Sequence, residues 1–299
     1  MAKDEESVRE HYGDLVQNYT DAYDAENLWN VKIYPAAHFR LVNFLNTLRN
    51  SPKQRVLDAG CGEGSPLIAV AGLGHDVRGF DFTDEMVETA KRQFSANDMD
   101  PAWISKASIE DYDSFAALCE DGPFDTAICF GVLPHVNSEL NCLRNMHKAL
   151  RKGGTVHVSF RNELFNMFTF NRFTYGYIMD SLLGGAPEDI RETASAFLED
   201  RVERNIPPLR VSTERGKPGY DAIKAKMHNP LDMPALFENA GFRFKRIFWY
   251  HFHPIFPMLE GKAIDKRRFR EAAFELEKNP FDTRGAFLCS AFVVEATAE

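Results

Sequence analysis

A glycine-rich turn between two apolar segments constrains this chain more than any other feature. The apolar residues Val56 and Leu57 lead into a turn with glycine at positions 60, 62 and 64, and a second apolar segment ends on Asp81. Glycine lets the backbone turn tightly and approach a ligand closely, because it has no Cβ. A carboxylate about 20 residues further on is the usual partner of a ribose hydroxyl pair in nucleotide-binding βαβ units. The pattern therefore predicts a site for an adenosine-containing cofactor.

The spacing of the glycines narrows the choice of cofactor. A dinucleotide-binding turn follows the pattern G-x-G-x-x-G and holds a pyrophosphate at the next helix N-terminus. Counted from Gly60, the third glycine of that pattern would fall on Ser65. Apart from Ser65, nothing basic or rich in hydroxyl groups surrounds the turn, so the pattern favours a cofactor without phosphates. A nicotinamide oxidoreductase stays open as an alternative, although it needs the glycine that Ser65 replaces.

Predicted strands and helices alternate along the first half of the chain, which indicates a parallel sheet with helices on both faces. We expect strands at 55–58, 76–80, 102–105, 126–130 and 155–160, and helices at 8–23, 34–48, 65–73, 83–94 (capped by Thr83) and 139–150. The alternation stops after Phe160, where an aromatic cluster begins. It resumes with a helix at 231–240 that ends at Gly241, and with strands at 243–250 and 286–295.

The break in the alternation divides the chain into four parts. Open α/β sheets bind ligands at the carboxyl ends of their strands, so the irregular part is expected to cover that edge as a lid. We therefore expect N-terminal helices that cover the cofactor site, a cofactor-binding core, a lid or acceptor-binding insert, and the C-terminal part of the core sheet, at residues 1–50, 51–160, 161–230 and 231–299.

Four motifs in order resemble the class I S-adenosylmethionine (SAM) methyltransferases. They are the turn at 58–64, Asp81, the segment 124–135 and the turn at 150–154. The resemblance implies a Rossmann-like α/β fold with a seven-stranded sheet, mostly parallel with one antiparallel strand. It also implies S-adenosyl-L-methionine as methyl donor and S-adenosyl-L-homocysteine as product. A protein that binds SAM without catalysing a reaction is the non-enzyme alternative.

The same resemblance assigns a cofactor site. Asp81 is expected to accept hydrogen bonds from both ribose hydroxyls, and Asp58 to order the turn and attract the ammonium group of the cofactor. Ser108 stands where many members of the family carry an acidic residue, and Tyr19 belongs to a helix that folds over SAM in similar enzymes. The expected cofactor-binding residues are Asp58, Gly60, Cys61, Gly62, Gly64, Asp81, Phe82, Met86, Ser108, Ile109, Phe130, Gly131, Val132 and Tyr19.

Four histidines are candidates for a catalytic base, because the pKa of imidazole lies nearest to neutral pH. They are His135, which follows the expected strand at 126–130, His228, and the pair His251 and His253. Residues two apart on a strand face the same side, so a metal site at that pair is an alternative. The sequence shows no third ligand, and we predict no metal. A purely structural role is the remaining alternative for all four.

Polar and aromatic residues of the insert and of the strand at 243–250 are candidates for binding the methyl acceptor. Aromatic side chains often line small-molecule sites, although they also form the core of a helical lid. The two arginines are able to hold an acidic group by bidentate contacts. The expected acceptor-binding residues are Arg161, Asn162, Arg172, Tyr175 and Tyr250.

Composition limits the class of acceptor. A net charge of −9 argues against a nonspecific nucleic-acid binder. No segment is apolar and long enough to span a bilayer. Five cysteines without a C-x-x-C pair suit a reducing cytoplasm.

Segments 159–175 and 249–254 also resemble bacterial methyltransferases associated with surface-sugar gene clusters. We therefore expect a cytoplasmic enzyme for a small polar metabolite that is sugar-like or amino-acid-like, with no nucleic-acid or membrane partner. A protein or RNA methyltransferase, and a homodimer, stay open.

Overall fold

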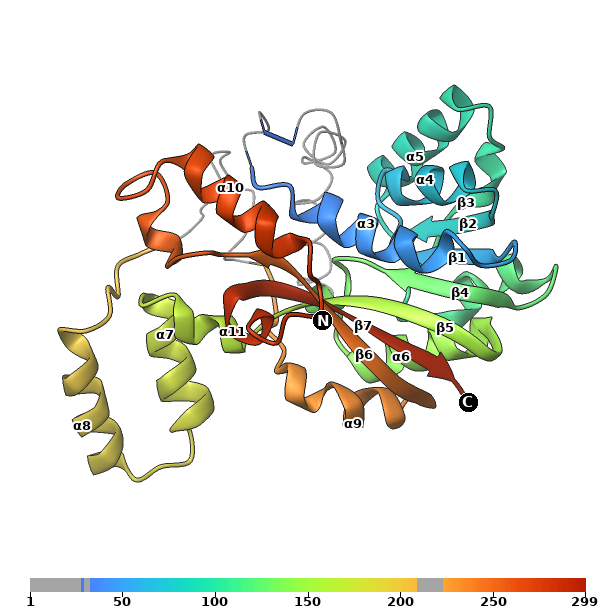
Figure 1. The fold of residues 1–299 in the computed structure, drawn as a ribbon. Coiled ribbons are helices and arrows are strands. Elements are labelled where there is room, and N and C mark those ends of the chain that lie inside the picture. Colours follow the sequence, from blue (N-terminus) through green and yellow to red (C-terminus); the bar gives the residue numbers. More distant parts are fainter. Residues whose placement is uncertain (1–27, 30–32, 209–222) are drawn as a thin grey trace.

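A seven-stranded sheet forms the centre of the molecule (Figure 1). The computed structural model describes residues 28–29, 33–208 and 223–299. The strand order is β3-β2-β1-β4-β5-β7-β6, and within the described residues β7 is the one antiparallel strand, paired with β5 and β6. The strands are β1 (Arg55–Ala59), β2 (Asp76–Asp81), β3 (Ile104–Lys106), β4 (Phe124–Cys129), β5 (Leu150–Arg161), β6 (Phe242–Phe252) and β7 (Cys289–Ala298). The predicted fold class is confirmed.

Helices cover both faces of this sheet (Figure 1). Side chains alternate between faces along a strand, so Val56 packs into the core beneath α3, α4 and α5, and Leu57 into the core with α6 and α9. The helices are α3 (Ala36–Leu48), α4 (Ser65–Gly72), α5 (Asp84–Ala96), α6 (Glu139–Ala149), α7 (Arg172–Gly176), α8 (Glu188–Glu199), α9 (Met233–Glu238), α10 (Lys266–Glu277) and α11 (Gly285–Leu288). The expected helix at 8–23, with Tyr19, lies outside the described residues.

Two expected elements differ from the structure because of proline. Ala102, expected in a strand, lies in a 3₁₀ turn (Pro101–Trp103) whose first N–H group is bound by the Asp100 carboxylate. The expected helix at 231–240 is shorter, because Pro234 lacks an N–H group and is tolerated only in the first turn of a helix. Gly241 follows that helix in a left-handed conformation, with φ +92°, as expected for a residue after a helix end.

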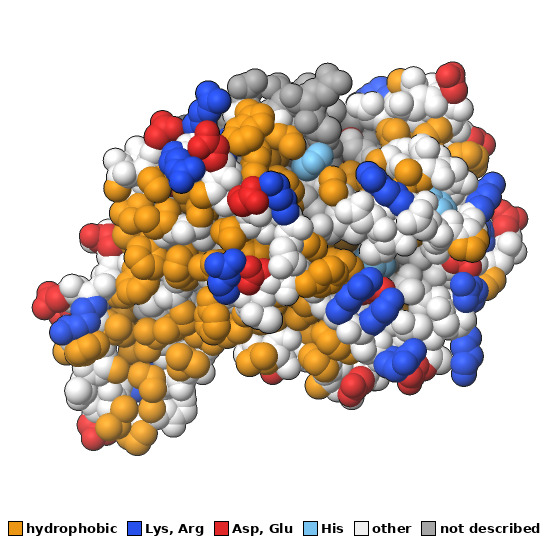
Figure 2. Space-filling view, viewed as in Figure 1, with side chains coloured by type: hydrophobic (Ala, Val, Ile, Leu, Met, Phe, Trp, Pro, Cys, Tyr) orange, Lys and Arg blue, Asp and Glu red, His pale blue; other side chains and the backbone are white. Residues whose placement is uncertain are grey.

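A helical arm projects from the body of the molecule (Figure 1). It contains α7, the π-helical turn η6 (Tyr177–Leu182) and α8, and it has a small core of Met179, Leu198 and Val202. Hydrophobic side chains gather on this arm in Figure 2, and Ile190 and Phe197 of α8 are about half exposed. Among the helices of the described residues, none has the length and apolar character needed to cross a membrane.

Candidate active site

A cavity of about 970 Å³ lies at the carboxyl ends of β1, β2, β4 and β5. Two parts of its lining are distinguished here by their position along the chain. The cofactor half is formed by lining residues between 58 and 66, 80 and 86, 107 and 110, and 130 and 132, together with Arg40. The acceptor half is formed by lining residues between 161 and 173, 206 and 208, 250 and 262, and by Met227 and Ser290. The topology thus brings segments from most of the described chain to one edge of the sheet.

The glycine turn follows β1 and has the geometry that its sequence predicts. Gly60 and Gly62 have φ values of +88° and +53°, in the left-handed region that glycine adopts readily. The backbone N–H groups of Gly60 and Cys61 donate to the Phe80 carbonyl, which ties the turn to β2. A Cβ on Gly60 would lie 2.2 Å from Cγ2 of Val132. A side chain at position 60 would therefore collide with the loop that follows β4.

Asp81 holds the end of β2 against this turn. Its Oδ2 accepts a hydrogen bond from the N–H of Gly62 at 3.0 Å, and its Oδ1 accepts one from the N–H of Thr83 at 2.9 Å. Burial raises the pKa of Asp81, and the backbone donors oppose that shift. Each carboxylate oxygen has two acceptor sites, so both oxygens retain capacity for a further donor. The side chain of Thr83 makes no cap hydrogen bond to α5, which corrects the expected capping role.

Three buried carboxyl groups, those of Asp58, Glu63 and Asp81, line the cofactor half. Burial raises the pKa of Asp58 to about 8, Arg40 opposes that shift, and Asp81 and Glu63 add to it. Within the described residues, Oδ1 of Asp58 has no hydrogen-bond partner. A ligand with an ammonium group would satisfy this oxygen and favour the ionised carboxylate. The donor set therefore fits a cofactor that is cationic at one end and carries a ribose diol at the other.

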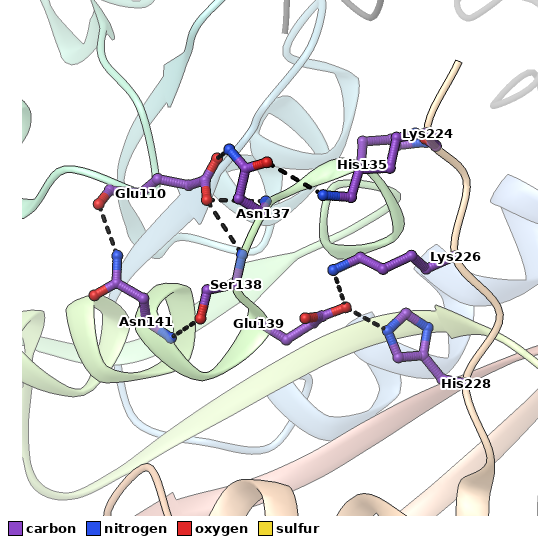
Figure 3. A network of polar contacts seen from close by, with 9 residues as sticks. All are labelled: Glu110, His135, Asn137, Ser138, Glu139, Asn141, Lys224, Lys226 and His228. Atoms are coloured by element: carbon purple, nitrogen blue, oxygen red, sulfur yellow. Dashed lines mark hydrogen bonds and ion pairs between the residues drawn. The ribbon is translucent and has the colours of Figure 1, made fainter. Parts of the chain in front are cut away.

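The loop after β3 forms the other end of the cofactor half. Ser108, Ile109 and Glu110 line the cavity there. The Glu110 carboxylate accepts hydrogen bonds from the backbone N–H groups of Asn137 and Ser138, so it joins this loop to the one before α6 (Figure 3). Ser108 donates no side-chain bond within the described residues, and its Oγ accepts the N–H of Glu110 at 3.3 Å.

A second group of contacts in Figure 3 fixes the segment that returns from the insert. Glu139 accepts from Nε2 of His228 at 3.0 Å and forms an ion pair with Lys226. Burial alone would raise the pKa of Glu139, but these two partners lower it to about 2. His228 lies outside the cavity lining with this carboxylate as its partner. His228 therefore holds the returning segment against Glu139 and does not line the cavity.

Two histidines at the end of β6 lie in the acceptor half. His251 has φ +62°, and its Nδ1 lies 2.6 Å from Oγ of Ser290. Nδ1 of His253 lies 3.1 Å from the carbonyl oxygen of His251. Burial lowers the pKa of His253 to about 4 and, together with the neighbouring His253, lowers that of His251 well below its usual value. Both imidazoles are therefore neutral at pH 7.

Glu277 and Tyr34 support this end of β6 from outside the cavity lining. The Tyr34 ring stacks on His251 with centroids 4.8 Å apart, and its hydroxyl donates to Oε1 of Glu277 at 2.8 Å. The same oxygen accepts the N–H of Phe252 at 2.8 Å. Burial raises the pKa of Glu277 to about 7, and burial and Glu277 raise that of Tyr34. The pair acts as a scaffold for the backbone around His251.

The structure brings most of the predicted site residues into this one cavity. From the predicted cofactor set, those that line it are Asp58, Gly60, Cys61, Gly62, Asp81, Phe82, Met86, Ser108, Ile109, Phe130, Gly131 and Val132. From the catalytic and acceptor sets, those that line it are His135, His251, His253, Arg161 and Tyr250. Their roles in binding and catalysis stay predictions.

Four other predicted residues lie outside the lining for identifiable packing reasons. Gly64 is the N-cap of α4, and a Cβ there would lie 3.2 Å from the ring of Phe94. The amide of Asn162 donates to two backbone carbonyl groups near α11, at 2.8 Å each. Arg172 donates to the Pro207 carbonyl, and the Tyr175 hydroxyl pairs with Ser195. These four residues, like His228, do not line the cavity, and their predicted roles in binding stay predictions.

Several lining residues are not among those predicted from the sequence. Arg40 of α3 lies 4.8 Å from the centre of the Phe130 ring, and Glu63 accepts a hydrogen bond from Ser65 at 2.7 Å. Arg40 lies four residues from Ala36 and four from Phe44, on the face of the helix that turns inward. An arginine on the inward face of an amphipathic helix is the sequence signal that indicates a site residue at position 40. Glu63 lies within the glycine turn and could have been recognised with it.

A family model for a methyltransferase domain matches residues 56–154, from β1 to the turn within β5. The matched region contains the glycine turn, Asp81, β4 and the loop after it. A ubiquinone biosynthesis O-methyltransferase of Actinobacillus pleuropneumoniae is 27% identical over 163 residues, which are 52% of this chain and 69% of that protein. The chain is a class I S-adenosylmethionine-dependent methyltransferase.

Further relatives agree with this family. A second protein with the same description, from Xanthomonas campestris pv. campestris, is 33% identical over 111 residues, which are 37% of this chain and 44% of that protein. The magnesium protoporphyrin IX methyltransferase of Synechocystis, solved with bound S-adenosylhomocysteine, has a TM-score of 0.52 at 15% identity and covers 99% and 100% of the two chains. The fold is therefore that of this methyltransferase class.

S-adenosylmethionine is the cofactor of this methyltransferase, and the cofactor half fits it. The unpartnered oxygen of Asp58 suits the ammonium group, and the remaining acceptor capacity of Asp81 suits a ribose diol. Glycine at position 60 leaves room where a Cβ would collide with Val132. In the part of the chain that the structure describes, no group of three or more His, Cys, Asp or Glu side chains is placed to hold a metal ion.

Proposed function

We propose that this methyltransferase moves the methyl group of S-adenosylmethionine to an oxygen, nitrogen or sulfur atom of a small molecule bound in the acceptor half. The observation that carries the proposal is the single cavity in which the two halves meet. The carboxylates of the cofactor half face the same space as Tyr250, His251 and His253. A donor and an acceptor bound there would be neighbours.

In this proposal each side chain of the cofactor half has one task. Asp58 binds the ammonium group, Asp81 accepts from the ribose hydroxyls, and the loop from Ser108 to Glu110 borders the adenine. Phe130 and Val132 line the passage from the cofactor half to the acceptor half. When bound, the cofactor supplies an electrophilic methyl group on a sulfonium. The protein contributes alignment and exclusion of water, and such positioning can supply up to roughly 7–11 kcal/mol.

The lining of the acceptor half favours a molecule with an apolar or aromatic body. Phe165, Phe173, Ile206, Met227 and Met258 all line it, and apolar walls with a few polar groups are typical of small-molecule sites. The names of the ubiquinone biosynthesis relatives agree with such an acceptor. A sugar-like or amino-acid-like acceptor, predicted from the sequence, remains the alternative. We also propose a cytoplasmic location, because all five cysteines are free thiols.

Transfer of labelled methyl from S-adenosylmethionine to a chemically mixed panel tests this function. The panel contains phenols, amines, thiols, amino acids and sugar nucleotides, and calorimetry on the same sample measures cofactor binding. We expect cofactor binding and a labelled product from a phenol or another aromatic compound of the panel. A product from sugar nucleotides alone would favour the alternative. Binding without any product would contradict a small-molecule acceptor of these classes and point to a protein or RNA.

A further inference from the structure

The backbone holds the imidazole of His253 in one tautomer. Its Nδ1 lies 3.1 Å from the carbonyl oxygen of His251. A carbonyl oxygen only accepts hydrogen bonds, so Nδ1 carries the proton of the neutral ring. With its proton on Nδ1, the neutral ring has an unprotonated Nε2 with a lone pair. The ring lines the acceptor half of the cavity.

The surroundings of His253 keep it neutral. Its side chain is 9% exposed and packs against the rings of Phe165 (4.6 Å), His251 (4.7 Å) and Phe269 (6.0 Å, from α10). Burial lowers its pKa to about 4, and two backbone hydrogen bonds oppose that shift. The titratable and charged groups that share this part of the cavity are Tyr250, His251, Arg161, Glu260 and Lys262. A neutral imidazole with a fixed tautomer is thus presented to whatever binds there.

A strained backbone conformation positions the hydrogen-bonding carbonyl. His251 has φ +62°, which is uncommon for a residue other than glycine and costs about 1–3 kcal/mol. The surrounding structure compensates for this cost. Ser290 pairs with the His251 ring, Tyr34 stacks on it, and Glu277 binds the next backbone N–H group. Backbone strain that is held by so many contacts is characteristic of functional sites.

We propose that His253 is the general base of this methyltransferase and that its acceptor is a hydroxyl-bearing molecule. The proposal rests on the proposed function above. As the hydroxyl oxygen forms its bond to the methyl carbon, the bond from that carbon to sulfur breaks and sulfur keeps the electron pair. The hydroxyl proton passes to Nε2 of His253. A free amine or a thioether would need no base, so the fixed lone pair favours oxygen as the acceptor atom.

The low basicity of His253 is compatible with this role. A hydroxyl proton becomes strongly acidic while the oxygen forms its new bond, so a weak base suffices if it is already in place. The imidazolium that results lies in an apolar enclosure that disfavours its charge. It therefore returns the proton to water when the product leaves. His251 acts as a positioning residue, because its carbonyl sets the tautomer of the base.

Nitrogen NMR on the wild-type chain labelled with ¹⁵N-histidine tests the tautomer without any acceptor. The signals that disappear in His253→Gln assign the residue. We expect His253 to show a protonated Nδ1 and an unprotonated Nε2 throughout pH 5.5–8. A protonated Nε2, or an imidazolium at pH 7, would overturn the proposal.

Three probes that present different atoms test the proton transfer itself. Catechol offers a hydroxyl, thiophenol a thiol that ionises readily, and benzylamine an amine. We expect His253→Gln to lower kcat for catechol by about 10²–10⁴-fold, with unchanged affinity for S-adenosylmethionine in calorimetry. Transfer to thiophenol should change by less than about threefold, because general-base assistance is not needed there. His147→Gln, a histidine of α6 outside the cavity lining, is the matched control and should behave as wild type.

The outcomes separate this proposal from the proposed function. Transfer to catechol that is unaffected in His253→Gln, or transfer confined to thiophenol and benzylamine, would overturn the general base while small-molecule methylation stands. Binding of S-adenosylmethionine without transfer to any of the three probes would count against both proposals together.

Discussion

The two halves of the cavity differ in how the chain builds them. The cofactor half comes mainly from short loops after consecutive strands, and Asp58 and Asp81 stand at or next to the strand ends that carry them. The acceptor half combines segments that are far apart in the chain, such as Phe165, His253 and Ser290. A βαβ unit positions its own loops. The acceptor half, in contrast, forms only when distant segments of the chain have packed together.

The halves also differ in the charge that they favour. Burial raises the pKa of Asp58 and Asp81 and lowers that of His251 and His253. A bound cation would favour ionisation of the two carboxyl groups, whereas the two imidazoles are neutral bases at pH 7. Variants of the first half should change cofactor affinity, and variants of the second should change turnover. The four predictions below test this separation, from the largest expected effect to the smallest.

Asp81→Asn should lower the affinity for S-adenosylmethionine by roughly 100-fold, measured by calorimetry. The asparagine amide replaces one accepting oxygen by a donor that faces the N–H group of Gly62 or Thr83. A lost hydrogen bond to a charged group costs about 1.5–3 kcal/mol. Asp113→Asn, an exposed carboxylate outside the lining, is the control and should bind as wild type. Wild-type affinity in Asp81→Asn would remove Asp81 from the cofactor site.

A pair of glycine variants separates backbone strain from collision. Gly60→Ala and Gly62→Ala both force alanine into positive φ, at about 1–2 kcal/mol each. At Gly60 the new methyl group also meets Val132, whereas at Gly62 nothing lies within 4 Å. Overpacking costs a further 1–3 kcal/mol or so, so Gly60→Ala should bind the cofactor about tenfold more weakly than Gly62→Ala. Val132→Ala should partly restore Gly60→Ala; equal losses in the two glycine variants would contradict the collision.

Binding of S-adenosylmethionine should release a proton from Asp58. Burial raises the pKa of Asp58 to about 8 in the ligand-free protein, so at pH 6–7 the carboxyl is mostly protonated. The ammonium group favours the ionised form, so affinity should rise with pH, by up to about tenfold per unit between pH 6 and 7.5. Calorimetry at pH 7 in phosphate and in Tris should then give different heats. Identical heats, or the same pH slope in Asp58→Asn, would show that another group is responsible.

Ser290→Ala should have the smallest effect and should act on turnover alone. It removes the 2.6 Å contact that orients the His251 ring, and a neutral hydrogen bond contributes about 0.5–1.5 kcal/mol. We expect kcat for the methyl acceptor to fall by roughly 2–10-fold, with unchanged cofactor affinity. Ser290→Thr keeps the hydroxyl and should recover most of the rate. A loss of cofactor affinity in Ser290→Ala would break the separation between the two halves.

Most residues predicted for the cofactor half line the cavity, because their signals in the sequence are local. Gly60, Gly62 and Asp81 carry their meaning in a spacing that the βαβ unit converts directly into positions. Fewer of the residues predicted for acceptor binding line the cavity. Asn162 and Tyr175 lie in an aromatic and polar stretch that looks like a binding surface, but their side chains bond to α11 and α8. Composition does not say which face of an irregular segment turns inward.

The sequence by itself determined the sheet, the glycine turn and the family, because periodicity and short-range spacing encode them. The tertiary structure decided that His253 joins the cavity while His228 binds Glu139, although both are histidines near the end of an element. It also decided the tautomer of His253, through a carbonyl that faces it because His251 adopts a left-handed conformation. Such choices depend on long-range packing and buried hydrogen bonds, which no local pattern records.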